Sequence, residues 1–246
     1  MLKHDPAVIG ELHLRVLHAV ARANESAGIP DLRLDGGTAL AAYYLHHRQS
    51  EDLDFFGGPA LNARELGERV REEALRDGVS LEPAGPSSTG FARYVARDLE
   101  NGSSEAVKVD IAGQSPFLLA PLEPTVEGIR IGSYRDLCAN KLHALCDRFE
   151  ARDFADLHAI LHRPEPGAAV GPDLLRARFH ALLEDLVTID PGLDAKLLGE
   201  GLARGVGKPL VSLFPLRLLL PFTDSELQET VRFCMDECVR IVNEVG

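Results

Sequence analysis

The chain has 246 residues, enough for two small domains that bury a core without disulfide or metal staples, and its 45% hydrophobic and 26% charged residues are ordinary for a soluble globular protein. Its net charge of −12 argues against a broad nucleic-acid-binding surface, which is usually basic. No apolar run of membrane-spanning length and no secretory signal are visible, so we expect a cytoplasmic protein.

Helices and strands alternate in the first half of the chain. Apolar residues at helical spacing predict helices, and short apolar runs between Gly, Pro and Asn predict strands. In chain order, we predict a helix over 6–26, a strand over 32–34, a helix over 38–46, a strand over 52–56, a helix capped by Asn62, strands over 91–99 and 106–112 around a turn at 101–103, and a strand over 128–131. Leu66, Val70 and Leu75 would form the apolar face of the helix that follows Asn62.

Only helices are predicted in the second half of the chain. Ser133 and Asp136 have the spacing of a capping box at the start of the first one. The predicted helices cover 134–148, 151–162, 172–188, 192–204 and 223–244. The sequence therefore predicts an α+β fold, with a small mixed sheet in a domain over 1–132 and an all-α helical domain over 133–246.

Cysteine and histidine residues do not form a clear metal-binding pattern. Cys138 and Cys146 are eight residues apart and Cys234 and Cys238 are four apart, whereas zinc sites favour closer pairs backed by further ligands. We therefore expect buried, reduced thiols. His158 and His162 have no acidic or cysteine partner at matching spacing, so packed or solvated histidines are favoured.

Two glycines stand between a predicted strand and a predicted helix. Gly36 and Gly37 would let the backbone approach a phosphate closely, and the N–H groups at the start of the helix would attract its negative charge. A tight connection without any ligand would explain the same pair of glycines.

Three aspartates on two predicted strands suggest a metal site. Asp52 and Asp54 lie two apart in a strand, so their side chains share one face. In the later strand, alternation sends its valines and isoleucine into the core and leaves Lys108 and Asp110 on the opposite face. Together the three carboxylates could hold two Mg²⁺ ions about 3.5–4 Å apart, one activating an attacking hydroxyl and one stabilising a leaving pyrophosphate. Solvated aspartates on an exposed edge strand are the alternative, and a buried ion pair between any of the three and an arginine would argue against the metal site.

Two blocks of sequence resemble a known family. The first is Gly36-Gly37-Thr38-Ala39-Leu40 followed by Arg48-x-Ser50-x-Asp52-Leu53-Asp54-Phe55-Phe56, and the second is Asp136-Leu137-x-Ala139-x-Lys141-Leu142-x-Ala144-Leu145-x-x-Arg148 followed by Arg152-Asp153-Phe154-x-Asp156-Leu157. Their order and spacing, over about residues 32–162, are similar to the AbiEii/AbiGii toxin family of polymerase-β-like nucleotidyltransferases. Many members of the superfamily have Gly-Ser at the first block, where this chain has a threonine one place later.

The resemblance implies a role for each matching residue. Gly36, Gly37 and Thr38 would bind the triphosphate, and Asp52, Asp54 and Asp110 would hold the metal. Lys141 and Arg148 would contact the triphosphate or stabilise its charge. Asp153 and Asp156 would complete the site, with Asp156 as the functional acid. Helical spacing also predicts that Lys141, Leu145, Arg148 and Arg152 line one stripe.

The resemblance further implies that the chain transfers a nucleoside monophosphate from a nucleoside triphosphate to a hydroxyl of RNA, such as a tRNA 3′ end, or of protein. Arg64, Arg69, Arg71 and Arg76, on one predicted helix, would offer a local RNA contact. A cognate antitoxin is the implied partner. Two alternatives stay open: a small-molecule nucleotidyltransferase of the aminoglycoside-modifying kind, which the acidic charge suits, and a non-catalytic nucleotide-binding module.

Overall fold

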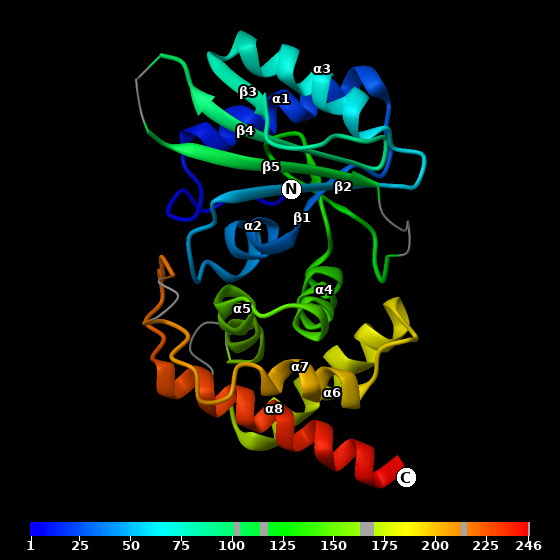
Figure 1. Ribbon diagram of the computed structural model, residues 1–246, viewed down its shortest axis with the longest axis vertical. Coiled ribbons are helices and arrows are strands. Elements are labelled where there is room, and N and C mark those ends of the chain that lie inside the picture. Colours follow the sequence, from blue (N-terminus) through cyan, green and yellow to red (C-terminus); the bar gives the residue numbers. More distant parts are fainter. Residues whose placement is uncertain (101–103, 114–117, 163–169, 213–215, 246) are drawn as a thin grey trace. The chain divides into compact units, whose positions relative to one another are not determined.

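The computed structural model describes residues 1–100, 104–113, 118–162, 170–212 and 216–245 (Figure 1). The chain divides into two compact units, one made of residues 1–117 and 121–133 and the other of residues 118–120 and 134–246. The first unit mixes helices with a sheet and the second contains helices, in keeping with the predicted α+β class. The predicted turn at 101–103 lies outside the described residues.

A seven-stranded mixed sheet forms the centre of the first unit. Its strands are β1 (Arg33–Asp35), β2 (Asp52–Gly57), β3 (Val79–Pro83), β4 (Phe91–Asp98), β5 (Ala106–Gly113), β6 (Glu123–Pro124) and β7 (Arg130–Ile131). They follow the order β3-β4-β5-β2-β1-β7-β6. The β2–β5 and β1–β7 pairs are parallel and the others are antiparallel. Strand β5, which carries Asp110, lies between β4 and β2. The alternative that Asp110 is a solvated residue of an edge strand is therefore excluded.

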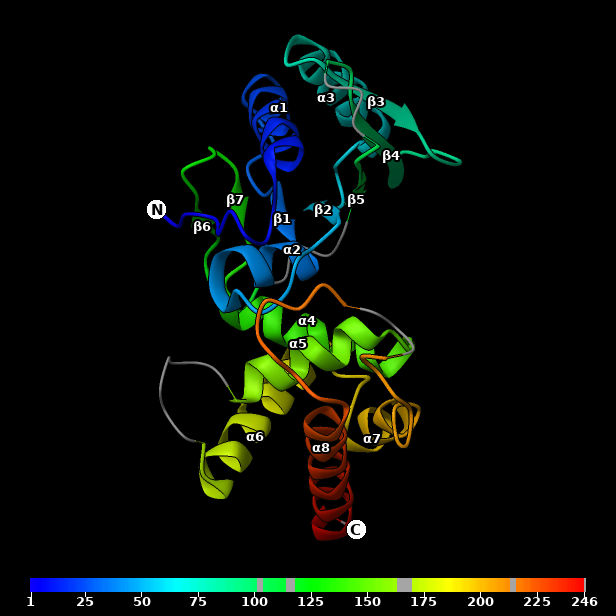
Figure 2. The same cartoon turned by 90° about the vertical axis from the view of Figure 1, so that its left-hand side faces the viewer.

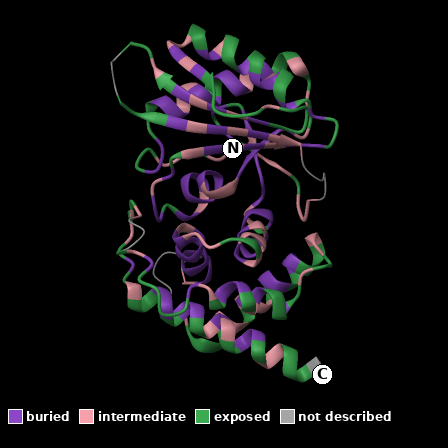
Figure 3. Cartoon of the chain, in the orientation of Figure 1, coloured by how far each residue is buried: buried purple, intermediate pink, exposed green. Residues whose placement is uncertain are grey.

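Two helices cover one face of this sheet. Helices α1 (Glu11–Ala27) and α3 (Ala63–Arg76) lie side by side over strands β3, β4 and β5 (Figures 1 and 2). The sheet residues beneath them alternate as predicted, so that Val107, Val109 and Ile111 are fully buried (Figure 3). The opposite face of β2 and β5 carries half-buried polar side chains, and it is the face on which the candidate site lies.

The short helix α2 (Gly36–Leu40) begins directly after β1 and packs against β1 and β2. It continues as one π-helical turn, η1 (Ala41–Leu45), which ends at His46 in a left-handed backbone conformation (φ 51°). The predicted helix over 38–46 is therefore present but starts at the glycine pair itself. This start places the glycines in the first turn of the helix rather than in a loop before it.

The second unit is a set of helices that agree closely with the predicted ones. They are α4 (Tyr134–Asp147), α5 (Ala151–His162), α6 (Pro172–Ile189), α7 (Ala195–Ala203) and α8 (Asp224–Val245). The Asp136 carboxylate at the start of α4 accepts hydrogen bonds from the backbone N–H groups of Leu119 and Ala120, at 2.7 and 3.3 Å. These bonds fix the segment that enters the helical unit. None of the described helices carries an apolar run of the length that crossing a bilayer requires.

Two local predictions were wrong and one strand was missed, each for an identifiable reason. Helix α1 starts at Glu11 and not near residue 6, because residues 5–9 form a turn and Gly10 is extended. Leu75 is 54% exposed, since four-residue spacing from Leu66 and Val70 leads to Ala74 instead. Strand β3 was not predicted, although Val79 and Leu81 alternate with polar residues in it.

The predicted burial of the cysteines holds for three of the four. All four cysteines are free thiols, and three of them are buried. The His158 and His162 rings stack at 4.4 Å, and both rings make a hydrogen-bond contact with the Thr230 hydroxyl.

Candidate active site

The turn after β1 brings the backbone against the carboxylate of Asp54. Gly36 has a φ of 70°, in the left-handed region that favours glycine. A Cβ atom at this position would lie 2.6 Å from Oδ2 of Asp54, so even alanine would collide with the carboxylate. The Asp35 carboxylate accepts a 2.7 Å hydrogen bond from the Gly36 N–H and thereby caps the helix start. Glycine is thus required at position 36 both for backbone conformation and for space.

Sheet register aligns charged residues from four adjacent strands. Asp35 of β1 is paired with Asp54 of β2, Asp54 with Asp110 of β5, and Asp110 with Arg93 of β4. Directly paired residues project to the same face of a sheet. Asp35, Asp54, Asp110 and Arg93 therefore form one row across the sheet, which we call the acidic row. Asp52 lies on the same face, two residues before Asp54.

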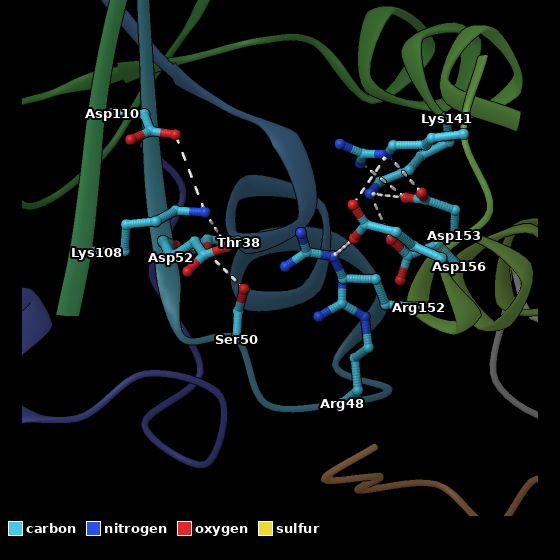
Figure 4. A network of polar contacts seen from close by, with 12 residues as sticks. Thr38, Arg48, Ser50, Asp52, Lys108, Asp110, Lys141, Arg152, Asp153 and Asp156 are labelled. Carbon is cyan, nitrogen blue, oxygen red and sulfur yellow. Dashed lines mark hydrogen bonds and ion pairs between the residues drawn. The ribbon is translucent and has the colours of Figure 1, made fainter. Parts of the chain in front are cut away.

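Two cations neutralise two of the predicted metal ligands. The Lys108 ammonium lies 2.8 Å from an Asp52 oxygen and 3.9 Å from an Asp110 oxygen (Figure 4). Arg93 donates two hydrogen bonds to Asp110, from Nε and from Nη2, each of 2.7 Å. A bidentate pair of this kind is strong and directional. The Arg93 side chain is still 42% exposed, so this is not a buried ion pair.

The Thr38 hydroxyl contributes to the fold of the site. It is 1% exposed and donates a hydrogen bond to the backbone carbonyl of Asp52, while lying 2.6 Å from the Ser50 hydroxyl. These contacts fasten the start of α2 to the start of β2 (Figure 4). The side chain of Thr38 therefore positions Asp52, and the backbone of the Gly36–Thr38 turn is the part suited to a phosphate.

The acidic row has the donor chemistry of a magnesium site. Mg²⁺ takes oxygen ligands and commonly uses one or two carboxylates together with substrate phosphates. Asp54 and Asp110 are register partners on neighbouring parallel strands, and Asp52 is next to them on β2. Within the described residues, no three His, Cys, Asp or Glu side chains are already arranged around a common metal position. The residues fit the ion in kind and in placement, and ion binding requires Lys108 and Arg93 to give up part of their present contacts.

A second charged cluster is buried in the helical unit. The Lys141 ammonium of α4 lies 2.9 Å from Asp153 and 2.7 Å from Asp156, both on α5 (Figure 4). Arg148 adds two hydrogen bonds to Asp153, of 2.9 and 3.2 Å. Both carboxylates have no exposed side-chain surface, and Lys141 is 7% exposed. Asp153 and Asp156 are thus neighbours, as predicted, but this cluster is not the exposed Arg–Asp pair of an ordinary helix hairpin.

Opposing effects act on the pKa of Asp153. Burial by itself would raise it, but the charge of Lys141 and the hydrogen bond from Arg148 hold it below its ordinary value. Asp153 is therefore a carboxylate, and its charge belongs to a fixed network.

The predicted stripe of Lys141, Leu145, Arg148 and Arg152 was partly wrong. Helix α4 ends at Asp147, so Arg148 follows the helix and Arg152 belongs to α5. Arg152 donates a hydrogen bond to Glu150, and Leu145 is fully buried. Lys141 and Arg148 meet through Asp153 and not through helical spacing.

Sequence reasoning missed two members of the acidic row. Asp35 precedes the glycine pair, and Arg93 stands in a strand whose alternation is visible in the sequence. The alternation of Phe91, Arg93, Val95 and Arg97 indicates a shared face, but only the register of β4 against β5 shows that Arg93 meets Asp110. Such long-range pairing is not encoded by local pattern.

The chain matches a known protein family over most of its length. A family model described as the nucleotidyl transferase AbiEii toxin of type IV toxin–antitoxin systems matches residues 18–239. No curated protein matches the chain.

Solved structures share the fold. JHP933 from Helicobacter pylori is 25% identical, with 97% of each chain covered and a TM-score of 0.53. MenT4, a nucleotidyltransferase toxin from Mycobacterium tuberculosis H37Rv, is 18% identical, with 92% of this chain and 83% of that chain covered and a TM-score of 0.55. These similarities extend over both units of the chain.

Proposed function

This chain belongs to the AbiEii nucleotidyltransferase toxin family, and we propose that it transfers a nucleoside monophosphate from a nucleoside triphosphate to an acceptor hydroxyl with the help of Mg²⁺. The acidic row carries the proposal. It places Asp54 and Asp110 side by side on adjacent strands, with Asp54 directly under the Gly36 turn. Carboxylates next to a backbone turn that can approach phosphate suit a reaction on a metal-bound triphosphate.

Each predicted site residue of the first unit has a part in this reaction. The turn of Gly36, Gly37 and Thr38 would bind the phosphates through N–H groups of the first helical turn other than that of Gly36, which donates to Asp35. Asp52, Asp54 and Asp110 would hold two Mg²⁺ ions, which would lower the pKa of the attacking hydroxyl and neutralise the charge that develops on pyrophosphate. The new bond joins the acceptor oxygen to the α-phosphorus, and the bond from the α-phosphorus to the pyrophosphate oxygen breaks.

The cluster in the helical unit supplies cations for the same reaction. We assign Lys141 and Arg148 to the triphosphate, where positive charge stabilises the leaving pyrophosphate. Asp156 is the acid that holds Lys141 in place, at 2.7 Å. The division into a domain over 1–132 and a helical domain over 133–246 that completes the active site is part of this proposal.

RNA or protein is the proposed acceptor, and a cognate antitoxin is the proposed partner. The arginines of α3 are poor candidates for an RNA contact, because Arg69, Arg71 and Arg76 each form an ion pair with a glutamate of the same helix. A small cationic acceptor is the second candidate, since the net charge of −12 favours it. Incubation with radiolabelled triphosphates and separate pools of RNA, protein and aminoglycosides distinguishes the three by which pool gains label.

The variant Asp54→Asn tests the proposal. It removes one carboxylate charge from the middle of the acidic row while keeping its shape, so we expect turnover to fall by at least about a hundredfold, roughly 2.7 kcal/mol of transition-state stabilisation. Transfer of label from the α-phosphate of the triphosphate measures the rate, and a thermal melt checks the fold.

Asp236→Asn is the matched control, because Asp236 is an exposed aspartate of α8 outside both charged clusters. It should retain the activity of the unmodified chain. Full activity in the Asp54 variant would refute the metal site.

A further inference from the structure

Arg93 is placed where a metal ion would have to compete with it. Its guanidinium donates two 2.7 Å hydrogen bonds, one to each carboxylate oxygen of Asp110. Both oxygens of this proposed metal ligand are therefore already bonded to Arg93. The strand register fixes this meeting, since Arg93 and Asp110 are direct partners across β4 and β5. An arginine fork matches a carboxylate well and keeps its charge at all relevant pH values.

The field at Arg93 comes from all three predicted ligands. The hydrogen bonding of Arg93 to the Asp110 carboxylate is the main reason why the pKa of Arg93 lies above its ordinary value, and the charges of Asp110, Asp52 and Asp54 raise it further. Three carboxylates on one face repel one another unless a cation is present. Lys108 relieves this repulsion at Asp52 and Arg93 relieves it at Asp110.

Phe91 gives Arg93 a second support away from the carboxylates. The guanidinium carbon lies 5.4 Å from the centre of the Phe91 ring, within the range of a cation–π contact. Phe91 is 37% exposed and stands two residues before Arg93 on the same face of β4. A guanidinium that leaves Asp110 can therefore stay over an aromatic ring at the open side of the sheet.

We propose that Arg93 is a positioning residue that stands in for the metal, holding Asp110 in its ligand position until a divalent cation displaces the guanidinium toward Phe91. The proposal rests on the metal site of the proposed function. It explains why three acidic side chains are stable together on one half-buried face, and it makes metal binding an exchange of one cation for another. It also predicts that the affinity for the metal is lower than the three carboxylates alone would give.

Binding of Mn²⁺ alone, without nucleotide, tests the exchange. In Arg93→Gln the metal competes with Lys108 alone and no longer with a guanidinium at Asp110. We therefore expect Mn²⁺ to bind about tenfold or more tightly than to the unmodified chain, as one positive charge is removed a few ångströms from the ion. Titration followed by the electron paramagnetic resonance signal of free Mn²⁺ measures the affinity. The metal-free variant should also melt at a lower temperature and be stabilised more by Mn²⁺, because tighter binding to the folded state raises the melting temperature further.

Arg97→Gln is the matched control. Arg97 lies on the same face of β4, four residues from Arg93 and opposite Ala106 of β5, so the same charge is lost away from the acidic row. Its Mn²⁺ affinity should stay within about twofold of the unmodified chain at ordinary ionic strength. Arg93→Lys, which keeps the charge and loses the fork, should give an intermediate affinity and also serves if the glutamine variant does not fold.

Equal Mn²⁺ affinity in the unmodified chain, Arg93→Gln and Arg93→Lys would overturn the role of Arg93 and leave the metal site intact. Weaker binding in Arg93→Gln would overturn it as well. Absence of Mn²⁺ binding in every form would overturn both this inference and the proposed metal site.

Discussion

Lys141 lies between two carboxylates that have no exposed surface. Its positive charge therefore stabilises the fold whether or not it also contacts a substrate. Removing one partner of a buried ion pair leaves an uncompensated charge in a medium that solvates it poorly. Asp153 retains Arg148 as a second partner, at 2.9 Å. A loss of activity on substitution of Lys141 would therefore not by itself show contact with the triphosphate.

We predict that Lys141→Ala lowers the free energy of unfolding by about 3–5 kcal/mol. Urea denaturation measures the change. The double variant Lys141→Met, Asp156→Asn should lose less stability than Lys141→Ala, because it removes the Lys141 charge together with one of its carboxylate partners while Asp153 keeps Arg148. The double variant should remain inactive if Lys141 acts on the triphosphate, and a cost below about 1 kcal/mol for Lys141→Ala would contradict the structural role.

At the scale of elements, the packing of α3 on the sheet depends on one glycine. A Cβ atom at Gly67 would lie 2.2 Å from the Tyr94 hydroxyl oxygen and 2.5 Å from ring atoms of the same side chain. Tyr94 is 1% exposed in β4, so it has little room to move. Helix propensity alone would favour alanine at an interior helical position by about 1 kcal/mol.

We predict that Gly67→Ala destabilises the protein by about 1–3 kcal/mol, because the overpacking cost exceeds the gain in helix propensity. Thermal and urea unfolding measure the difference. In a double-mutant cycle, Tyr94→Leu should remove most of the cost of the alanine. A stabilising Gly67→Ala would mean that the helix can shift away from the sheet at little cost.

Elements with strong local patterns were predictable from the sequence. Helices α4, α5, α6 and α8 begin and end within two residues of their predicted bounds, because capping residues, apolar spacing and Pro or Gly breaks are local signals. The same holds for β5, where alternation alone separated Val107 and Val109 from Lys108 and Asp110. Strand β3 was missed because it is a short edge strand with few apolar residues, and edge strands carry weak patterns.

The candidate site was predictable in its residue types and not in its contacts. Asp52, Asp54 and Asp110 share a face, as strand periodicity requires. The partners that neutralise them, Arg93 above all, depend on which strands pair and in what register. Those choices are made by packing over the whole sheet and cannot be obtained from the neighbours of each residue in the chain.

At the scale of the whole molecule, acid should destabilise the protein in two stages. Burial and the charge of Arg178 lower the pKa of His162 below its ordinary value of 6.5, so this histidine favours the folded state when neutral. Its contribution is complete above about pH 6.5 and is lost as the pH falls below that value. Burial alone would raise the pKa of Glu237, but hydrogen bonds from Arg176, Arg240 and His180 lower it to about 2. Its contribution is complete above its ordinary pKa of 4.5 and is lost as the pH falls from there toward 2.

We predict that Glu237→Gln is less stable than the unmodified chain by about 1.5–3 kcal/mol at pH 7, the usual range for hydrogen bonds to a charged group. The difference should shrink as the pH falls from 4.5 to 2, because the unmodified carboxyl becomes protonated over that range. Urea unfolding at a series of pH values checks this. A difference that does not change with pH would show that Glu237 acts through its shape and not its charge.

The four members of the acidic row come from four strands, and none comes from a connecting segment. The hydrogen-bonded register of these strands therefore sets the positions of the four side chains relative to one another. Loops around such a site can lengthen, shorten or change composition while the reacting groups keep their spacing. Remodelling of the loops alone would therefore change which acceptors fit beside the acidic row without altering the distances between its side chains.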